Sequence, residues 1–176
     1  MIEIETKIVD FDVNRLRAKL KQRGAASSGE ILQRRWIFNL SKNEGEDEFI
    51  RVRTDGKKCT IAYKHRKGDK LGNTEEIEVS TDDFDSSAEI FSKFIKDKKY
   101  QENKRETFIL GEVEITINRW PMIAPVVEIE ASSEKKVRDT IKELDIGGRE
   151  LGNIGWEKLY KQYGIDLNAY EVLKFK

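Results

Sequence analysis

The sequence has little of what builds the commonest metal and redox sites. Its 176 residues include one cysteine, Cys59, and one histidine, His65. A single cysteine cannot form an internal disulfide, and the two residues together are too few for a zinc site of thiolates and imidazoles. Any metal bound by this chain would therefore be a hard cation held by oxygen ligands.

Net charge, long apolar runs and linkers are also missing. The 33 basic residues balance the 33 acidic ones, so no overall field attracts nucleic acid or an anionic membrane. No apolar run reaches membrane-spanning length, and the first residues lack the pattern of a secretion signal. We expect one cytoplasmic domain over residues 1–176, with no nucleic-acid or membrane partner.

What is present is a series of alternating segments with helical ones between them. Apolar spacing and capping residues predict four helices, at residues 13–23, about 82–95, 133–144 and 155–164. Period-two alternation predicts strands at 2–9, 31–40, 48–54, 58–65, 74–80, 104–110, 112–118 and 125–131, with a further one in the tail at 171–175. Turns at 55–56 and 110–111 favour hairpins, so we predict an α+β fold: an antiparallel, closed or nearly closed barrel with helices outside.

The polar side of these strands is almost purely ionisable. A solvated outer face would explain one Glu-x-Glu most simply. Four such motifs favour a second interpretation, in which the charged face lines the inside of the barrel, because Glu is a poor strand former and adjacent like charges destabilise a strand pair. The ionisable residues on this side are Glu3, Glu5, Lys7, Arg51, Arg53, Lys64, Glu76, Glu78, Arg105, Glu112, Glu114, Glu128 and Glu130.

These two kinds of charge indicate two kinds of binding. Clustered carboxylates without His or Cys are typical ligands of Mg²⁺ or Mn²⁺. Clustered Arg and Lys bind phosphate, which Arg can hold with two parallel hydrogen bonds. Both sets on one face predict a polyanionic, metal-complexed substrate such as a polyphosphate or a nucleoside triphosphate.

The order and spacing of the motifs resemble the CYTH superfamily, the triphosphate tunnel metalloenzymes, which includes class IV adenylate cyclases, thiamine triphosphatases and inorganic tripolyphosphatases. The resemblance extends nearly end to end and rests on EIETK (3–7), RVR (51–53), TIAYK (60–64), EEIEV (75–79), KR before TFIL (104–110) and EVEITINRWPMIAPVVEIEA (112–131). It implies an eight-stranded antiparallel barrel closed into a tunnel. Acidic residues would hold one or two divalent ions there, and basic residues would grip the triphosphate.

The resemblance also implies a role for each matching residue. The metal-side residues would be Glu3, Glu5, Glu76, Glu78, Glu114, Glu128 and Glu130, with Glu76 and Glu78 ordering metal, water or neighbouring bases. Phosphate would be bound by Lys7, Arg51, Arg53, Lys64 and Arg105. Glu5 and Lys7 would be catalytic. Lys7 would either contact phosphate or, with its pKa lowered by neighbours, help to activate a nucleophile.

Three functions are compatible with this pattern. The first is a hydrolase, dependent on Mg²⁺ or Mn²⁺, that acts on inorganic tripolyphosphate or a nucleoside triphosphate. The second is a class IV adenylate cyclase, which makes cyclic AMP and pyrophosphate from ATP. The third is a non-catalytic module that binds polyphosphate or nucleotide. In each, the partner is a small molecule that contains a triphosphate. The sequence leaves open whether the chain forms a homodimer.

Some positions depart from the family pattern or are undecided. Thr74 stands where the family commonly has an arginine, and Asn118 where it has an aspartate, so the grip on phosphate and the charge available for metal are both reduced. One of Arg34 and Arg35 must face inward if their strand joins the barrel, and the sequence does not say which. Trp120 and Trp156 are interpreted as packing residues.

Overall fold

The computed structural model describes residues 2–40, 46–67 and 74–176, and four helices lie where the sequence predicts them. They are α1 (Val13–Gln22), α2 (Phe84–Phe94), α3 (Glu134–Glu143) and α4 (Trp156–Gln162), followed by a short 3-10 helix at Leu167–Ala169. Asp12 begins α1 as expected, because its carboxylate accepts hydrogen bonds from two backbone N–H groups of the first turn, each at 2.9 Å. In the described ranges, no helix is long and apolar enough to cross a membrane.

The described residues form one sheet of eleven strands. They are β1 (Ile2–Glu3), β2 (Glu5–Val9), β3 (Ala26–Asn39), β4 (Glu46–Thr54), β5 (Cys59–Lys67), β6 (Thr74–Thr81), β7 (Lys98–Leu110), β8 (Val113–Arg119), β9 (Val126–Glu130), β10 (Arg149–Gly152) and β11 (Val172–Leu173). Their order is β1-β6-β5-β4-β3-β7-β8-β9-β2-β10. All of these neighbours are antiparallel, and β11 adds a parallel pair on β7.

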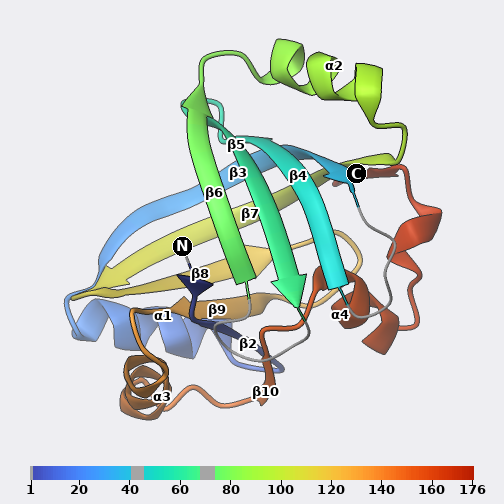
Figure 1. Cartoon of the computed structure of the whole chain (residues 1–176). Helices are drawn as coiled ribbons and strands as arrows, with labels where there is room; N and C mark the ends of the chain where they lie inside the picture. The colour runs from blue at the N-terminus through green and yellow to red at the C-terminus, as the bar shows by residue number, and fades with distance from the viewer. Residues whose placement is uncertain (1, 41–45, 68–73) are drawn as a thin grey trace.

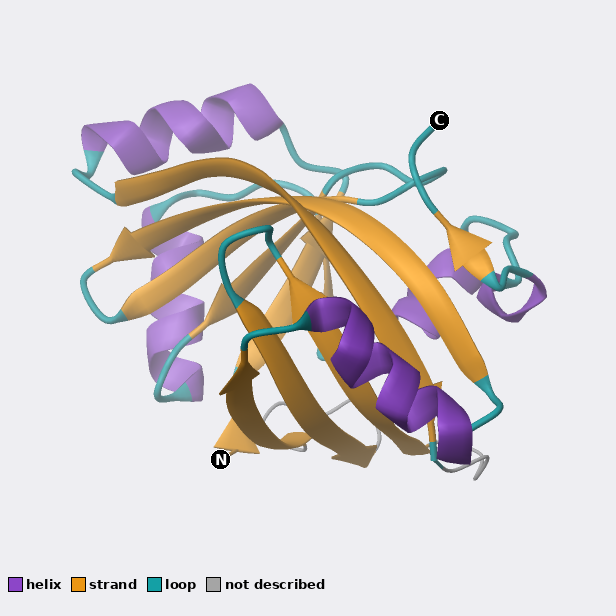
Figure 2. Ribbon diagram, turned by 90° about the horizontal axis from the view of Figure 1, so that it is seen from above, coloured by secondary structure: helices purple, strands orange, loops and turns teal. Residues whose placement is uncertain are grey.

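The sheet differs from the expected eight-stranded closed barrel in two ways. The strand count was wrong, because the N-terminal segment divides at Ile4 into β1 and β2 and because β10 is added, whereas β11 lies in the tail where a further strand was predicted. Closure is not observed either: within the described residues, no ladder joins the two ends of the path. The reason is that β2 pairs with β9 on one edge and with β10 on the other. The result is a curled half-barrel with helices outside it (Figures 1 and 2).

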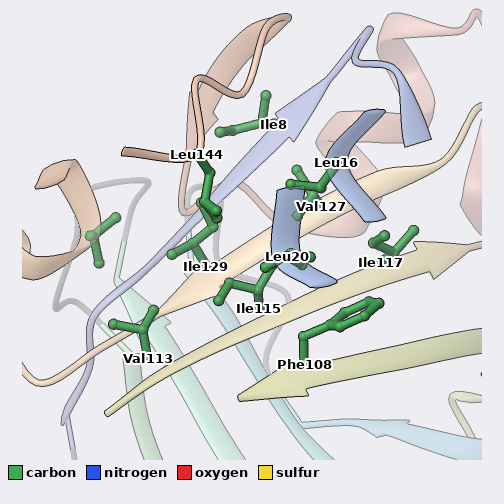
Figure 3. Packing of buried hydrophobic residues seen from close by; sticks show 11 residues of the cluster. Ile8, Leu16, Leu20, Phe108, Val113, Ile115, Ile117, Val127, Ile129 and Leu144 are labelled. Atoms are coloured by element: carbon green, nitrogen blue, oxygen red, sulfur yellow. The ribbon is translucent and has the colours of Figure 1, made fainter. Parts of the chain in front are cut away.

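The outer face of the sheet carries the larger apolar core. Leu16 and Leu20 of α1 and Val137 of α3 pack on Ile8, Ile115, Ile117, Val127 and Ile129 from β2, β8 and β9 (Figure 3). The strands β2, β8 and β9 form one arm of the curled sheet, and β3, β4, β5 and β6 form the other. On this second arm, α2 covers β3, β4 and β5 through Phe84 and Ala88. On β6, by contrast, Ile77 and Val79 of the outer side are 58% and 55% exposed.

Candidate functional site

The charged residues share the inner face of the curled sheet, opposite the face that carries the apolar cores. Strand register lines them up across neighbouring strands: Glu5 lies opposite Glu130 and Lys7 opposite Glu128. On the next strand, Glu114 lies opposite Glu130. The other arm places Lys64 opposite Glu76. The register therefore places these residues on one face of the sheet, as the alternation predicts.

One part of this face, the acidic wall, consists of Glu5, Glu114, Glu128 and Glu130 on β2, β8 and β9. Glu130 lies between Glu5 and Glu114 in register. Desolvation, and then the charges of Glu5 and Glu114, raise the pKa of Glu130 to about 7. Among the described side chains, no three acidic groups already converge on one metal position. The row is nevertheless all oxygen, and a divalent cation would relieve its repulsion.

Lys7 is the ammonium at the centre of this wall. It is 2% exposed, its Nζ donates to Glu5 Oε1 at 2.9 Å, and it lies 3.3 Å from Glu128 Oε1. Burial acts to lower the pKa of Lys7, but Glu5 and Glu128 outweigh it and raise the pKa above its usual value. The expectation of a lowered pKa was therefore wrong, and Lys7 is a charged ammonium at neutral pH.

The two carboxylates beside Lys7 stay ionised for the same reason. Burial acts to raise the pKa of Glu5, but Lys7 and Lys64 outweigh it and lower the pKa to about 2. The pKa of Glu128 is also lowered, because Lys7 and Arg105 overcome the effect of its burial. These ion pairs leave two carboxylates charged beside a neighbour, Glu130, that titrates near neutrality.

Asn118 stands where the family commonly has an aspartate, and both the NH2 group and the oxygen of its amide form hydrogen bonds. It is fully buried. Its Nδ2 donates to Glu128 Oε2 at 2.9 Å, while its Oδ1 accepts from Arg105 Nε at 2.8 Å. Arg105 also donates to Glu128 through Nη2 at 2.7 Å. An ionised aspartate could not donate to Glu128, so the amide fits a network in which Glu128 is paired with Arg105.

The opposite part of the inner face, the basic wall, consists of Arg51, Arg53 and Lys64 on β4 and β5. The Nη2 of Arg51 donates to Glu76 Oε1 at 3.0 Å and to Glu78 Oε2 at 2.9 Å. The Nζ of Lys64 lies 3.0 Å from Glu76 Oε2. Of the roles open to Glu76 and Glu78, these contacts favour ordering of neighbouring bases over metal binding.

Three acidic or polar positions lie outside this account. Glu3 is in β1, but its side chain, like that of Thr74, falls outside the described residues. Glu112 was expected on the same strand face as Glu114, which was wrong. It precedes β8 in an exposed turn and forms an ion pair with Lys136 of α3.

Sequence reasoning left Arg35 undecided, and the structure places it on the inner face. Arg35 is 5% exposed and lies opposite Arg53 in register, whereas Arg34 is exposed on the other face over the Phe84 ring. Its guanidinium lies 4.7 Å from the ring centroid of Trp120, whose ring packs at 4.4 Å, tilted by 37°, against that of Trp156 at the start of α4. The same parity rule that found Arg51 could have found Arg35, had the position of β3 in the sheet been known.

Comparisons with known proteins place the fold. No protein-family model matches the chain, and no curated protein matches its sequence. Solved structures do match. The PH1012 protein from Pyrococcus horikoshii OT3 aligns with a TM-score of 0.68 and 23% identity, over 83% of this chain and 92% of that one.

Two further matches cover more of the chain. A candidate adenylate cyclase from Vibrio parahaemolyticus has a TM-score of 0.70 and 12% identity over 92% of this chain and 98% of its own. HpAC1 from Hippeastrum, a candidate adenylyl cyclase with a dominant triphosphatase activity, has a TM-score of 0.61 and 14% identity, over 96% and 99%. The chain thus has the CYTH fold that its motifs implied.

Proposed function

We propose that this protein is a divalent-metal-dependent hydrolase of triphosphate groups, with inorganic tripolyphosphate or a nucleoside triphosphate as substrate. The observation that carries the proposal is the division of one sheet face into an acidic wall and a basic wall. Like charges in neighbouring register positions destabilise an empty site, and a metal-complexed polyanion complements both walls at once. The triphosphatase activity of HpAC1, which shares the fold, supports this choice.

The basic residues would hold the phosphate chain. Arg51 is held by two carboxylates, so its guanidinium is ordered before a ligand arrives. Preorganised cations of this kind stabilise negative charge on phosphoryl oxygens without reorganising during the reaction. Lys7, charged and fixed between Glu5 and Glu128, would stabilise a phosphoryl oxygen or give its proton to a leaving oxygen.

The acidic wall would hold the metal. Glu5, Glu114 and Glu130 offer only oxygen, as Mg²⁺ and Mn²⁺ prefer, and the raised pKa of Glu130 reflects repulsion that a cation would remove. When bound, the metal would neutralise charge on the phosphate chain and help to orient it. Glu130 would have to lose its proton for this, so metal affinity should rise with pH through about 7.

One assay tests the proposal. Purified protein is incubated with Mg²⁺ or Mn²⁺ and either tripolyphosphate or ATP, and the products are identified. Orthophosphate release that stops on chelation is the expected result. Cyclic AMP with pyrophosphate would instead establish the cyclase, and binding without turnover under either metal would establish the binding module.

A matched pair of variants tests the site. Glu5→Gln removes a carboxylate of the acidic wall and should lower kcat by about a hundredfold or more, as does the loss of a main electrostatic group in other enzymes. Glu75→Gln makes the same change on the exposed, opposite side of β6 and should leave kcat unchanged. Full activity in Glu5→Gln would refute the site assignment.

A further inference from the structure

Arg35 differs from every other arginine on the inner face in what surrounds it. Arg51 and Arg53 pair with Glu78, and Arg105 pairs with Glu128. Within the described part of the chain, Arg35 has no carboxylate within ion-pair distance. Its hydrogen bonds go to two neutral amides, the Oε1 of Gln33 and the Oδ1 of Asn103.

The side chains next to it leave donors without acceptors. Arg35 Nε, Arg51 Nε and Trp120 Nε1 are buried and have no hydrogen-bond partner among the residues that the structure describes. An unsatisfied buried donor destabilises the protein until it finds an acceptor. All three are N–H groups, so the missing partner is an acceptor. Trp120 lies directly against the Arg35 guanidinium, which puts two of these donors on adjacent side chains.

The charges nearest to Arg35 also favour an anion as the missing partner, because most of them are positive. Burial, and then the charges of Arg51, Arg53 and Arg105, lower the pKa of Arg35. Arg53 faces Arg35 across the β3–β4 ladder, and its own pKa is lowered to about 10 by burial and by Arg51 and Arg105. A cation in this position gains from an anion far more than from any neutral ligand.

We propose that Arg35 is a further substrate-binding residue, which with the indole N–H of Trp120 binds one phosphoryl group of the oligophosphate at the end of the inner face that α4 covers. This inference rests on the proposed function and adds to it a subsite in which no described carboxylate lies within ion-pair distance of Arg35, although the charge of Glu128 acts on it from farther away. A metal ion would avoid this subsite, so the phosphoryl group here is held by N–H donors alone. The metal-bound part of the substrate lies toward the acidic wall.

The test is the binding of inorganic tripolyphosphate without divalent metal, measured by calorimetry, together with thermal melting. Arg35→Gln should raise the Kd for tripolyphosphate about tenfold to a hundredfold, as expected for losing a hydrogen bond to a charged group. Arg35→Lys keeps the charge but loses the planar donor pair, so its Kd should lie between that of the wild type and that of Arg35→Gln. Arg34→Gln, one residue away on the exposed face, should bind like the wild type.

Melting of the empty protein separates a binding role from a structural one. Arg35→Gln removes an unpaired buried cation, so its melting temperature without ligand should equal or exceed that of the wild type, while the rise caused by tripolyphosphate shrinks. A lower melting temperature with an undiminished ligand-induced rise would overturn the inference. Wild-type-like Kd in Arg35→Gln would also overturn it but leave the proposed function intact. A wild type that binds no tripolyphosphate without metal would overturn this inference alone, and one that binds none with Mg²⁺ either would overturn both.

Discussion

The Glu-x-Glu motifs on the two arms of the sheet have neighbours of opposite charge. On β9, Glu130 faces Glu5 and Glu114 across both neighbouring strands, and its pKa rises to about 7. On β6, Glu76 and Glu78 face the basic wall, and both pair with Arg51. A carboxylate pair therefore faces other carboxylates or pairs with arginine according to which strands flank it, a property that the motif alone does not carry.

The outer faces of the arms differ as well. Beneath β2, β8 and β9, two helices seal a continuous core, whereas α2 leaves the outer side of β6 uncovered. The arm that concentrates like charges on its inner face is thus the arm with the larger apolar support. Burial of apolar area can offset the cost of such a charged row.

The largest expected effect tests this difference in support. Ile115→Ala, at a fully buried position in the core, should lower the free energy of unfolding by about 3–4 kcal/mol. Ile77→Ala makes the same change on the exposed side of β6 and should cost less than about 0.5 kcal/mol. Urea denaturation gives both values. An equal cost at both positions would show that the outer side of β6 is covered in solution.

A smaller effect is expected when the basic wall is made to resemble the acidic one. Arg51→Gln leaves Glu76 and Glu78 without their shared partner, and we expect a loss of about 2–3 kcal/mol, below the range for fully buried pairs because Glu78 is partly exposed. Arg53→Gln removes only one bond, at 3.3 Å, and should cost less. Urea denaturation of both variants measures these losses, and a loss in Arg53→Gln as large as that in Arg51→Gln would contradict this explanation.

The smallest effect is expected when one negative charge is removed from the acidic wall. Folded protein holds a proton on Glu130 up to about pH 7, whereas the unfolded chain releases it near 4.5. This group therefore costs the wild type stability as pH rises through that window. Glu130→Gln should match the wild type at pH 4 and exceed it at pH 8, by about 1 kcal/mol or less after solvent screening.

A control variant and a measurement with Mg²⁺ complete the stability comparison of Glu130→Gln with the wild type. Glu75→Gln, on the exposed opposite side of the sheet, should show no such pH-dependent gain. Mg²⁺ should stabilise the wild type at pH 8 more than it stabilises Glu130→Gln, because the variant lacks one carboxylate of the row. The same gain at every pH would show that Glu130 does not titrate near neutrality.

Much of the site followed from parity alone. Alternation in a strand fixes which side chains share a face, so Glu5 with Lys7, Arg51 with Arg53, and Glu128 with Glu130 were grouped correctly. Apolar spacing and the Asp12 cap likewise placed the helices, since both signals are local. The short strand β10 was missed because its four residues, Arg149–Gly152, show no alternation strong enough to predict it.

What the tertiary structure decided was which faces meet. Strand order put Glu130 between two carboxylates, where burial and these neighbours raise its pKa, and it put Glu76 beside Lys64. It also turned Arg35 inward against Trp120, a pair 85 positions apart in the chain that no local pattern links. The sequence determined that two kinds of charge would share one face. Only long-range strand pairing determined which charges lie beside an opposite charge and which lie beside a like one, because electrostatic energy depends on distance in space and not along the chain.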